Sequence, residues 1–276
     1  MMKRLIVKTV IAIAVMALAV PANAQFGGLG RTIKARAKSK VEEKVRQKAY
    51  QATNPKNVAD EITSAIPEKG DAQEQLECKV SGHDYKMKGK INHGKWSKHQ
   101  SSTVTFTHIP ATLDEFKEVQ KVLGTEPQGA VALQVMAFEM FRRDQQLGTE
   151  ALKLNNTPTN LSSTLRQLKE VLGPDDSYAR PYLAAALMQG ANPANAYTPA
   201  YPYQVKMKVD PNKKYQESEL LDGVVIYLLI DSEGWDTNWR GVELVRPEDA
   251  PYYLVSNCPA MYTQCKKIKG KFAGLK

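Results

Sequence analysis

The separation of helical from strand patterns along the chain is the feature that most constrains its fold. In the middle, apolar residues recur at helical spacing, which predicts three helices: residues 112–123, residues 127–146, and a segment that Asn160 or Ser162 caps and that reaches Leu172. Nearer the end, alternating patterns predict four strands: residues 203–209, 223–231, 239–246 and 252–255. Segregated helices and strands indicate an α+β fold, with a helical N-terminal half packed on a mainly antiparallel C-terminal sheet.

Strand patterns also precede the helices. Residues 77–90 alternate unevenly and contain Gly82 and Gly89, which predicts a hairpin, and residues 101–109 form the clearest amphipathic strand pattern. A last helix is expected over residues 258–268. We therefore expect residues 76–276 to form a single α+β domain.

The first 24 residues are typical of a cleavable export signal. Lys3, Arg4 and Lys8 give a basic start, residues 10–20 are apolar, and Ala22-Asn23-Ala24 is a small-x-small cleavage box. The mature chain is expected to begin at Gln25 and to work in the periplasm or outside the cell. No later run approaches the roughly 20 apolar residues that span a bilayer, so we expect no transmembrane anchor after cleavage.

Positive charge is concentrated just after this signal. Residues 25–50 hold eight Lys or Arg against two Glu, whereas residues 101–276 hold 19 basic and 20 acidic groups. Residues 25–75 are expected to form a basic helical lead that either rests on an anionic envelope surface or is a solvated linker. A nucleic-acid partner is not expected for an exported protein. The candidate contact residues of the lead are Arg31, Lys34, Lys38, Lys40, Lys44 and Lys48.

Three cysteines follow the export signal: Cys78, Cys258 and Cys265. A straight helix would separate the Cα atoms of Cys258 and Cys265 by roughly 10 Å, which is too far for a disulfide. A turn at Pro259 would bring them closer. Two alternatives remain open, a Cys258–Cys265 disulfide or three free buried thiols.

All four histidines lie in one lysine-rich stretch, namely His83, His93, His99 and His108. Their spacings match none of the compact zinc patterns, and neighbouring lysines would repel a cation. Nucleophilic catalysis is not favoured either, because no Gly-x-Ser-x-Gly elbow is present. We expect no metal and no cofactor.

Acidic residues near the end of the chain are the candidate catalytic groups. Asp231, Glu233 and Asp236 lie close in sequence to the aromatic residues Tyr227, Trp235 and Trp239. Paired carboxylates beside aromatic rings are typical of glycosidases. The competing interpretation is an ordinary solvated turn, because Asp tolerates turn geometry.

A tyrosine- and proline-rich crossing adds candidate binding residues. Tyr197, Tyr201 and Tyr203, together with Trp235, would supply rigid contact surfaces for a peptide or a sugar. The alternative is a rigid strap that packs across a sheet.

Three segments of the body share a family pattern: residues 106–116, residues 190–203 with Gly-Ala-Asn-Pro-Ala-Asn-Ala-Tyr-Thr-Pro, and residues 231–235. In these segments the chain resembles a bacterial family of secreted proteins classed only as a domain of unknown function, over roughly residues 106–268. The resemblance implies a shared fold and an extracytoplasmic setting, and it implies no activity.

The function we expect is non-catalytic binding in the cell envelope. The ligand would be an anionic or glycan component, or another envelope protein. The alternative is an envelope glycan hydrolase that uses Asp231, Glu233 and Asp236.

Overall fold

The computed structural model describes residues 75–173 and 179–268. They belong to the second of two compact units of the chain, Asp71–Lys276. The expected export signal and the basic residues Arg31 to Lys48 of the lead lie outside the described residues, so these expectations stay predictions. Among the helices of the described ranges, none is long and apolar enough to cross a membrane.

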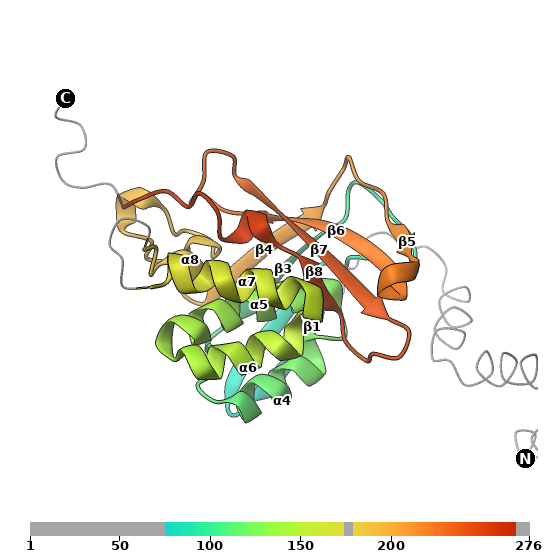
Figure 1. Cartoon of the computed structure of the whole chain (residues 1–276), viewed down its shortest axis with the longest axis horizontal. Helices are drawn as coiled ribbons and strands as arrows, with labels where there is room; N and C mark the ends of the chain where they lie inside the picture. The colour runs from blue at the N-terminus through green and yellow to red at the C-terminus, as the bar shows by residue number, and fades with distance from the viewer. Residues whose placement is uncertain (1–74, 174–178, 269–276) are drawn as a thin grey trace, which may run out of the picture. The chain divides into compact units, whose positions relative to one another are not determined.

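One curled antiparallel sheet carries a layer of helices (Figure 1). The strands are β1 (Gln75–Val80), β2 (His83–Lys88), β3 (Ser101–Phe106), β4 (Tyr203–Val209), β5 (Gln216–Ser218), β6 (Gly223–Asp231), β7 (Trp239–Pro247) and β8 (Leu254–Asn257). Their order is β1-β2-β3-β4-β6-β7-β8, and β5 pairs with β6. The helices are α4 (Leu113–Leu123), α5 (Pro127–Arg143), α6 (Gln145–Asn155), α7 (Pro158–Val171) and α8 (Leu183–Ala186). The α+β prediction is confirmed.

Three expected elements differ from the structure. The helix expected to be capped by Asn160 or Ser162 begins earlier, at Pro158, because the Thr157 hydroxyl caps it by accepting from Asn160 N. The helix expected over residues 127–146 ends at Arg143, because Asp144 is extended and its carboxylate accepts bonds from the backbone of Gln146 and Leu147, which starts α6. The helix expected over residues 258–268 is reduced to one 3₁₀ turn, η3 (Pro259–Met261). Beyond that turn the chain is bonded to the loop before β7, where Lys266 N donates to Gly234 O at 2.9 Å.

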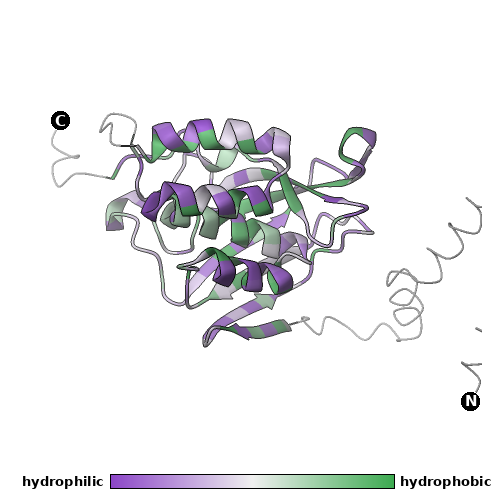
Figure 2. Ribbon diagram, turned by 60° about the horizontal axis from the view of Figure 1, so that its bottom comes forward, coloured by the Kyte–Doolittle hydropathy of each residue, from purple (hydrophilic) through white to green (hydrophobic). Residues whose placement is uncertain are grey.

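Helix α5 is the centre of the core. Every residue from Pro127 to Phe138 is buried. Helix α6 lies so close to α5 that a Cβ added to Gly148 would be 2.1 Å from Phe141 Cα, so only glycine fits there. The outer helices alternate hydrophilic and hydrophobic residues, as expected for helices with one solvent-facing side (Figure 2).

Buried amides tie the helices to the sheet. Gln134 Oε1 on α5 accepts hydrogen bonds from Asn155 Nδ2 and Asn156 Nδ2, both at 2.9 Å. Gln134 Nε2 donates to Asn156 Oδ1, which also accepts from Asn160 Nδ2 on α7 at 2.8 Å. Thr157 N donates to Val255 O on β8 at 3.0 Å. These side chains are at most 5% exposed, so the network has no water to replace a lost partner.

The cysteines are free, so of the two alternatives the Cys258–Cys265 disulfide is not formed. Cys258 is fully buried against Asn160 and Thr164, with its sulfur 3.5 Å from Asn160 Nδ2. The Cys265 sulfur lies 3.8 Å from the Tyr197 hydroxyl. Cys78 is half-buried rather than buried. The thiols of Cys258 and Cys265 therefore lie in different side-chain environments.

Replacing Gln134 by leucine tests the amide network. Gln134→Leu removes one of the two acceptors of Asn155 Nδ2 and of Asn156 Nδ2, which keep only their bonds to backbone carbonyls, so one buried N–H of each amide is left unpaired. We therefore expect the free energy of unfolding to fall by about 2–4 kcal/mol. Urea denaturation followed by circular dichroism measures this change. Gln145→Leu on the exposed start of α6 is the control and should shift the free energy by less than about 0.5 kcal/mol. Equal midpoints for both variants would contradict the assigned role.

Thiol chemistry tests the cysteine assignment. Burial raises the pKa of Cys265 to about 11 and raises the pKa of Cys258 as well. Because the thiolate is the reactive form, the native protein should be alkylated slowly at pH 8 at both positions, and Cys265 should react faster as the pH approaches 11. Mass spectrometry after alkylation in denaturant without a reductant should find Cys78, Cys258 and Cys265 all modified. If Cys258 and Cys265 both stayed unmodified, the two residues would be joined by a disulfide, and the assignment of free thiols would be wrong.

Candidate functional site

The face of the sheet that points away from the helices is the candidate site. Side chains alternate along each strand, so the residues between the core positions share this face. We call it the outer face; its side chains are half-buried or exposed and include Lys79, Lys86, Lys88, Thr103, Thr105, Gln204, Lys206, Lys208, Tyr227, Leu229, Asp231, Trp239 and Glu243. It combines basic, acidic, hydroxyl and aromatic groups.

Cation–π contacts hold both aromatic rings of the outer face. The Lys208 ammonium lies 3.8 Å from the centre of the Trp239 ring, and Lys213 lies 4.8 Å from that of Tyr227. The Tyr227 hydroxyl donates to Gln216 Oε1 at 3.1 Å. The rings are therefore oriented before any ligand arrives.

A shallow hollow of about 200 Å³ lies beside Tyr227. Tyr227, Gly241 and Glu243 contribute to its lining, and a Cβ added to Gly241 would meet no atom within 4 Å. The remaining lining residues are Asp210, Lys213, Leu228, Val242, Asn257, Pro259 and Ala260. Pockets for whole drug-sized ligands occupy about 300–1,000 Å³, so this hollow suits one group of a larger ligand.

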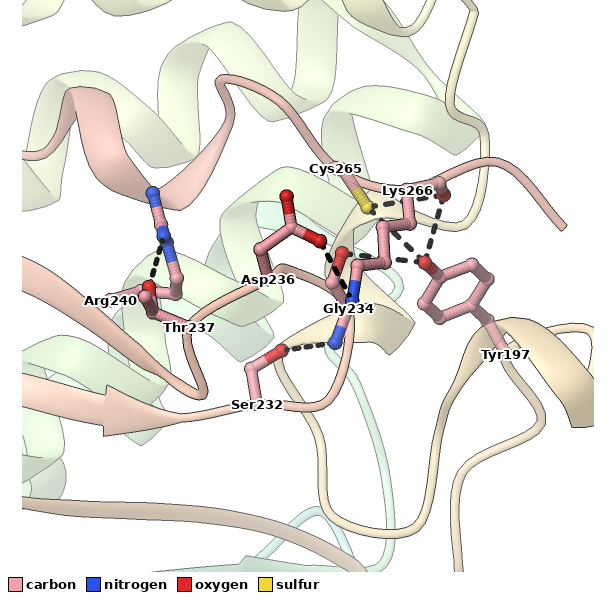
Figure 3. Close-up of polar contacts among 8 residues, drawn as sticks. All are labelled: Tyr197, Ser232, Gly234, Asp236, Thr237, Arg240, Cys265 and Lys266. Atoms are coloured by element: carbon pink, nitrogen blue, oxygen red, sulfur yellow. Dashed lines mark hydrogen bonds and ion pairs between the residues drawn. The ribbon is translucent and has the colours of Figure 1, made fainter.

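Two of the predicted binding residues are buried. Tyr197 and Trp235 are each only 2% exposed, so neither ring is available for the predicted surface contact. The Tyr197 hydroxyl donates to Lys266 O at 2.8 Å, and its ring stacks on Tyr182 with centroids 4.4 Å apart. Trp235 Nε1 donates to Thr263 O at 2.5 Å. Figure 3 shows Tyr197 and Cys265 meeting beside the loop that carries Gly234.

The other two predicted tyrosines lie nearer the surface. Tyr201 is 69% exposed, and its ring meets Tyr203 edge-on with centroids 5.6 Å apart. Tyr203 is half-buried and also contacts Phe106. Tyr197 therefore matches the alternative of a rigid strap that packs across the sheet. Tyr201 has an exposed ring, which could make the predicted contact with a peptide or a sugar.

The three candidate catalytic acids have different surroundings. Asp231 Oδ2 lies 3.5 Å from Lys206 Nζ on the outer face. Asp236 has a side chain that is 97% exposed, and its ion pair with Lys266 at 3.2 Å is visible in Figure 3. Glu233 is exposed. None of the three lines the hollow described above.

Residue spacing did not reveal two groupings that the fold creates. The contact of Trp239 with Lys208 follows from alternation along β7 and β4, which the sequence pattern does contain, whereas Lys213 reaches Tyr227 from the loop between β4 and β5. His83, His108 and Glu115 meet with ligand-type atoms within 4.8 Å of one another, although the histidines are 25 positions apart. Only the pairing of β2 with β3 brings them together.

A comparison with family models identifies the body of the chain. The model described as "Domain of unknown function (DUF6935)" matches residues 108–269. No curated protein and no solved structure matches the chain. The matched residues make up more than half of the 276-residue chain and run from just after β3 to just beyond η3. The chain therefore belongs to the DUF6935 family of domains of unknown function.

Proposed function

We propose that this protein is an exported, non-catalytic protein of the cell envelope that binds an anionic glycan on the outer face of its sheet. The observation that carries the proposal is the Lys208–Trp239 pair beside the uncovered backbone of Gly241. An aromatic ring offers an apolar surface to a sugar ring, and the ammonium group attracts the negative charge of the ligand.

The charge balance of the outer face supports this choice. Lys206 and Lys213 are paired with Asp231 and Glu243. Lys208 instead rests on an aromatic ring, which leaves its positive charge uncompensated by that contact. An approaching carboxylate or phosphate would therefore be drawn to Lys208, next to the ring on which a sugar stacks.

The basic lead would add a second, less specific attraction. Its candidate residues Arg31, Lys34, Lys38, Lys40, Lys44 and Lys48 would contact the same anionic envelope, with a strength that falls as salt is added. Export, which the first 24 residues predict, would bring the protein to such polymers.

Truncation of Trp239 tests the proposed binding. Trp239→Ala removes the stacking surface and the platform for Lys208, so we expect binding of polygalacturonate to weaken by roughly 5–30-fold, equivalent to about 1–2 kcal/mol. Affinity gel electrophoresis with polygalacturonate, and with neutral dextran for comparison, measures the change. Gly241→Gln should act in the same direction, because it places a side chain in the hollow without a clash at Cβ.

The matched control for Trp239→Ala is Tyr201→Ala, which removes an exposed ring outside the outer face. Unchanged binding by Tyr201→Ala is expected. A loss with Tyr201→Ala but not with Trp239→Ala would move the site to the tyrosine-rich crossing. Retention by every variant would contradict the proposal and leave a protein partner as the next candidate.

Neutralising the exposed acids separates binding from hydrolysis. The double variant Glu233→Gln/Asp236→Asn should bind the anionic glycan as well as the unmodified protein does, because neither acid belongs to the outer face. Release of reducing ends should be absent in both. Reducing ends released by the unmodified protein and lost in the variant would instead establish the hydrolase.

A further inference from the structure

The histidine–glutamate cluster lies on the core side of the sheet, apart from the outer face. Tyr85 on β2 pairs with Phe106 on the antiparallel strand β3. His83, two residues before Tyr85, therefore lies opposite His108, two residues after Phe106. Their rings stack with centroids 3.9 Å apart and planes inclined by 11°. The register of two strands therefore fixes this histidine pair.

The start of α4 adds the carboxylate. Thr112 caps the helix by accepting from Glu115 N, and Glu115 Oε2 accepts from Ala111 N at 2.8 Å. The other oxygen, Oε1, lies 3.1 Å from His108 Nε2. One oxygen of Glu115 is thus held by the backbone while the other faces the histidine pair.

We propose that His83, His108 and Glu115 bind one Zn²⁺ ion through one ring nitrogen of each histidine and Glu115 Oε1, with water as the fourth ligand. Their candidate ligand atoms already lie within 4.8 Å of one another. Zinc bonds of about 2.0–2.2 Å in a tetrahedron separate neighbouring ligand atoms by roughly 3.4 Å. The 3.1 Å between His108 and Glu115 is close to this edge. Binding requires the stacked rings to turn, so that the in-plane lone pairs of both histidines point to one ion.

Two of the lysines near the histidines, Lys79 and Lys86, lie on the other face of the sheet from the cluster. Lys79 and Lys86 alternate with the core-side residues of their strands and are paired with Asp84 at 3.2 Å and Glu77 at 3.2 Å. Their ammonium groups therefore lie on the outer face and carry local acidic partners. The Glu115 and His108 side chains are 11% and 28% exposed, so an ion can enter while the carboxylate is shielded from bulk water.

A buried hydroxyl beside the cluster is a second observation that points to a ligand. The Tyr85 side chain is fully buried, and among the described residues its hydroxyl has no hydrogen-bond partner. A tyrosine hydroxyl carries a proton that it can donate in a hydrogen bond. A zinc-bound water would give this donor an acceptor.

Zinc titration of the full chain after EDTA treatment tests the site. Isothermal titration with Zn²⁺ should give one ion per chain, and Glu115→Gln and His108→Gln should each weaken the affinity by at least about tenfold. Gln at position 115 keeps an acceptor for Ala111 N, so α4 keeps its cap. His99→Ala, an exposed histidine outside the cluster, is the control and should bind as the unmodified protein does.

Cobalt substitution supplies a second readout that a change in folding would not imitate. Bound Co²⁺ should give the intense visible absorption of tetrahedral coordination, and the double variant His83→Gln/His108→Gln should lose it while keeping the circular dichroism of the native fold. Zinc binding that is absent, or equal in the cluster variants and the unmodified protein, would overturn the proposal and leave the three side chains as a hydrogen-bonded stack. Neither outcome depends on glycan binding at the outer face.

Discussion

The bidentate amide pair of Gln134 and Asn156 is the contact on which the helical layer depends. An apolar core tolerates repacking as long as volume is kept, whereas a buried amide network is satisfied in few arrangements. Asn160 extends the network to α7, and the backbone of Val255 extends it to β8. The helices are therefore fixed to the sheet in one register, and the strands keep the spacing that both candidate sites require.

Local pattern was enough to predict the α+β class and most strands, because alternation and capping are short-range properties. It failed where tertiary contacts determine where a helix ends or whether a side chain is buried. The apolar pattern runs through Asp144, so the break before α6 was missed, although Asp is a common helix cap. Tyr197 and Trp235 carry polar atoms that suit a binding surface. Both rings are nevertheless buried, and their polar atoms donate hydrogen bonds to backbone carbonyls. No composition signal distinguishes these two uses of an aromatic residue.

The two faces of one sheet separate two kinds of chemistry. Alternation along β2 places Lys86 on the outer face and His83 and Tyr85 on the core side, so neighbours in sequence belong to different environments. A linear count of lysines around the histidines therefore does not separate the lysines on the histidine side of the sheet from those, such as Lys86, on the other side. In the same way, Asp231 belongs with Lys206 across the sheet rather than with Glu233 in the following turn.

The pairing of β3 with β4 joins segments separated by about a hundred residues, from Phe106 with Tyr203 to Ser101 with Lys208. The family match begins at residue 108, so β1, β2 and β3 lie outside it although they complete the same sheet. A fragment cut at that boundary would leave the backbone donors and acceptors of β4 open along a whole edge. Such an edge is a template for pairing with other chains, so a fragment limited to the family-matched residues would aggregate rather than fold as it does in the whole protein.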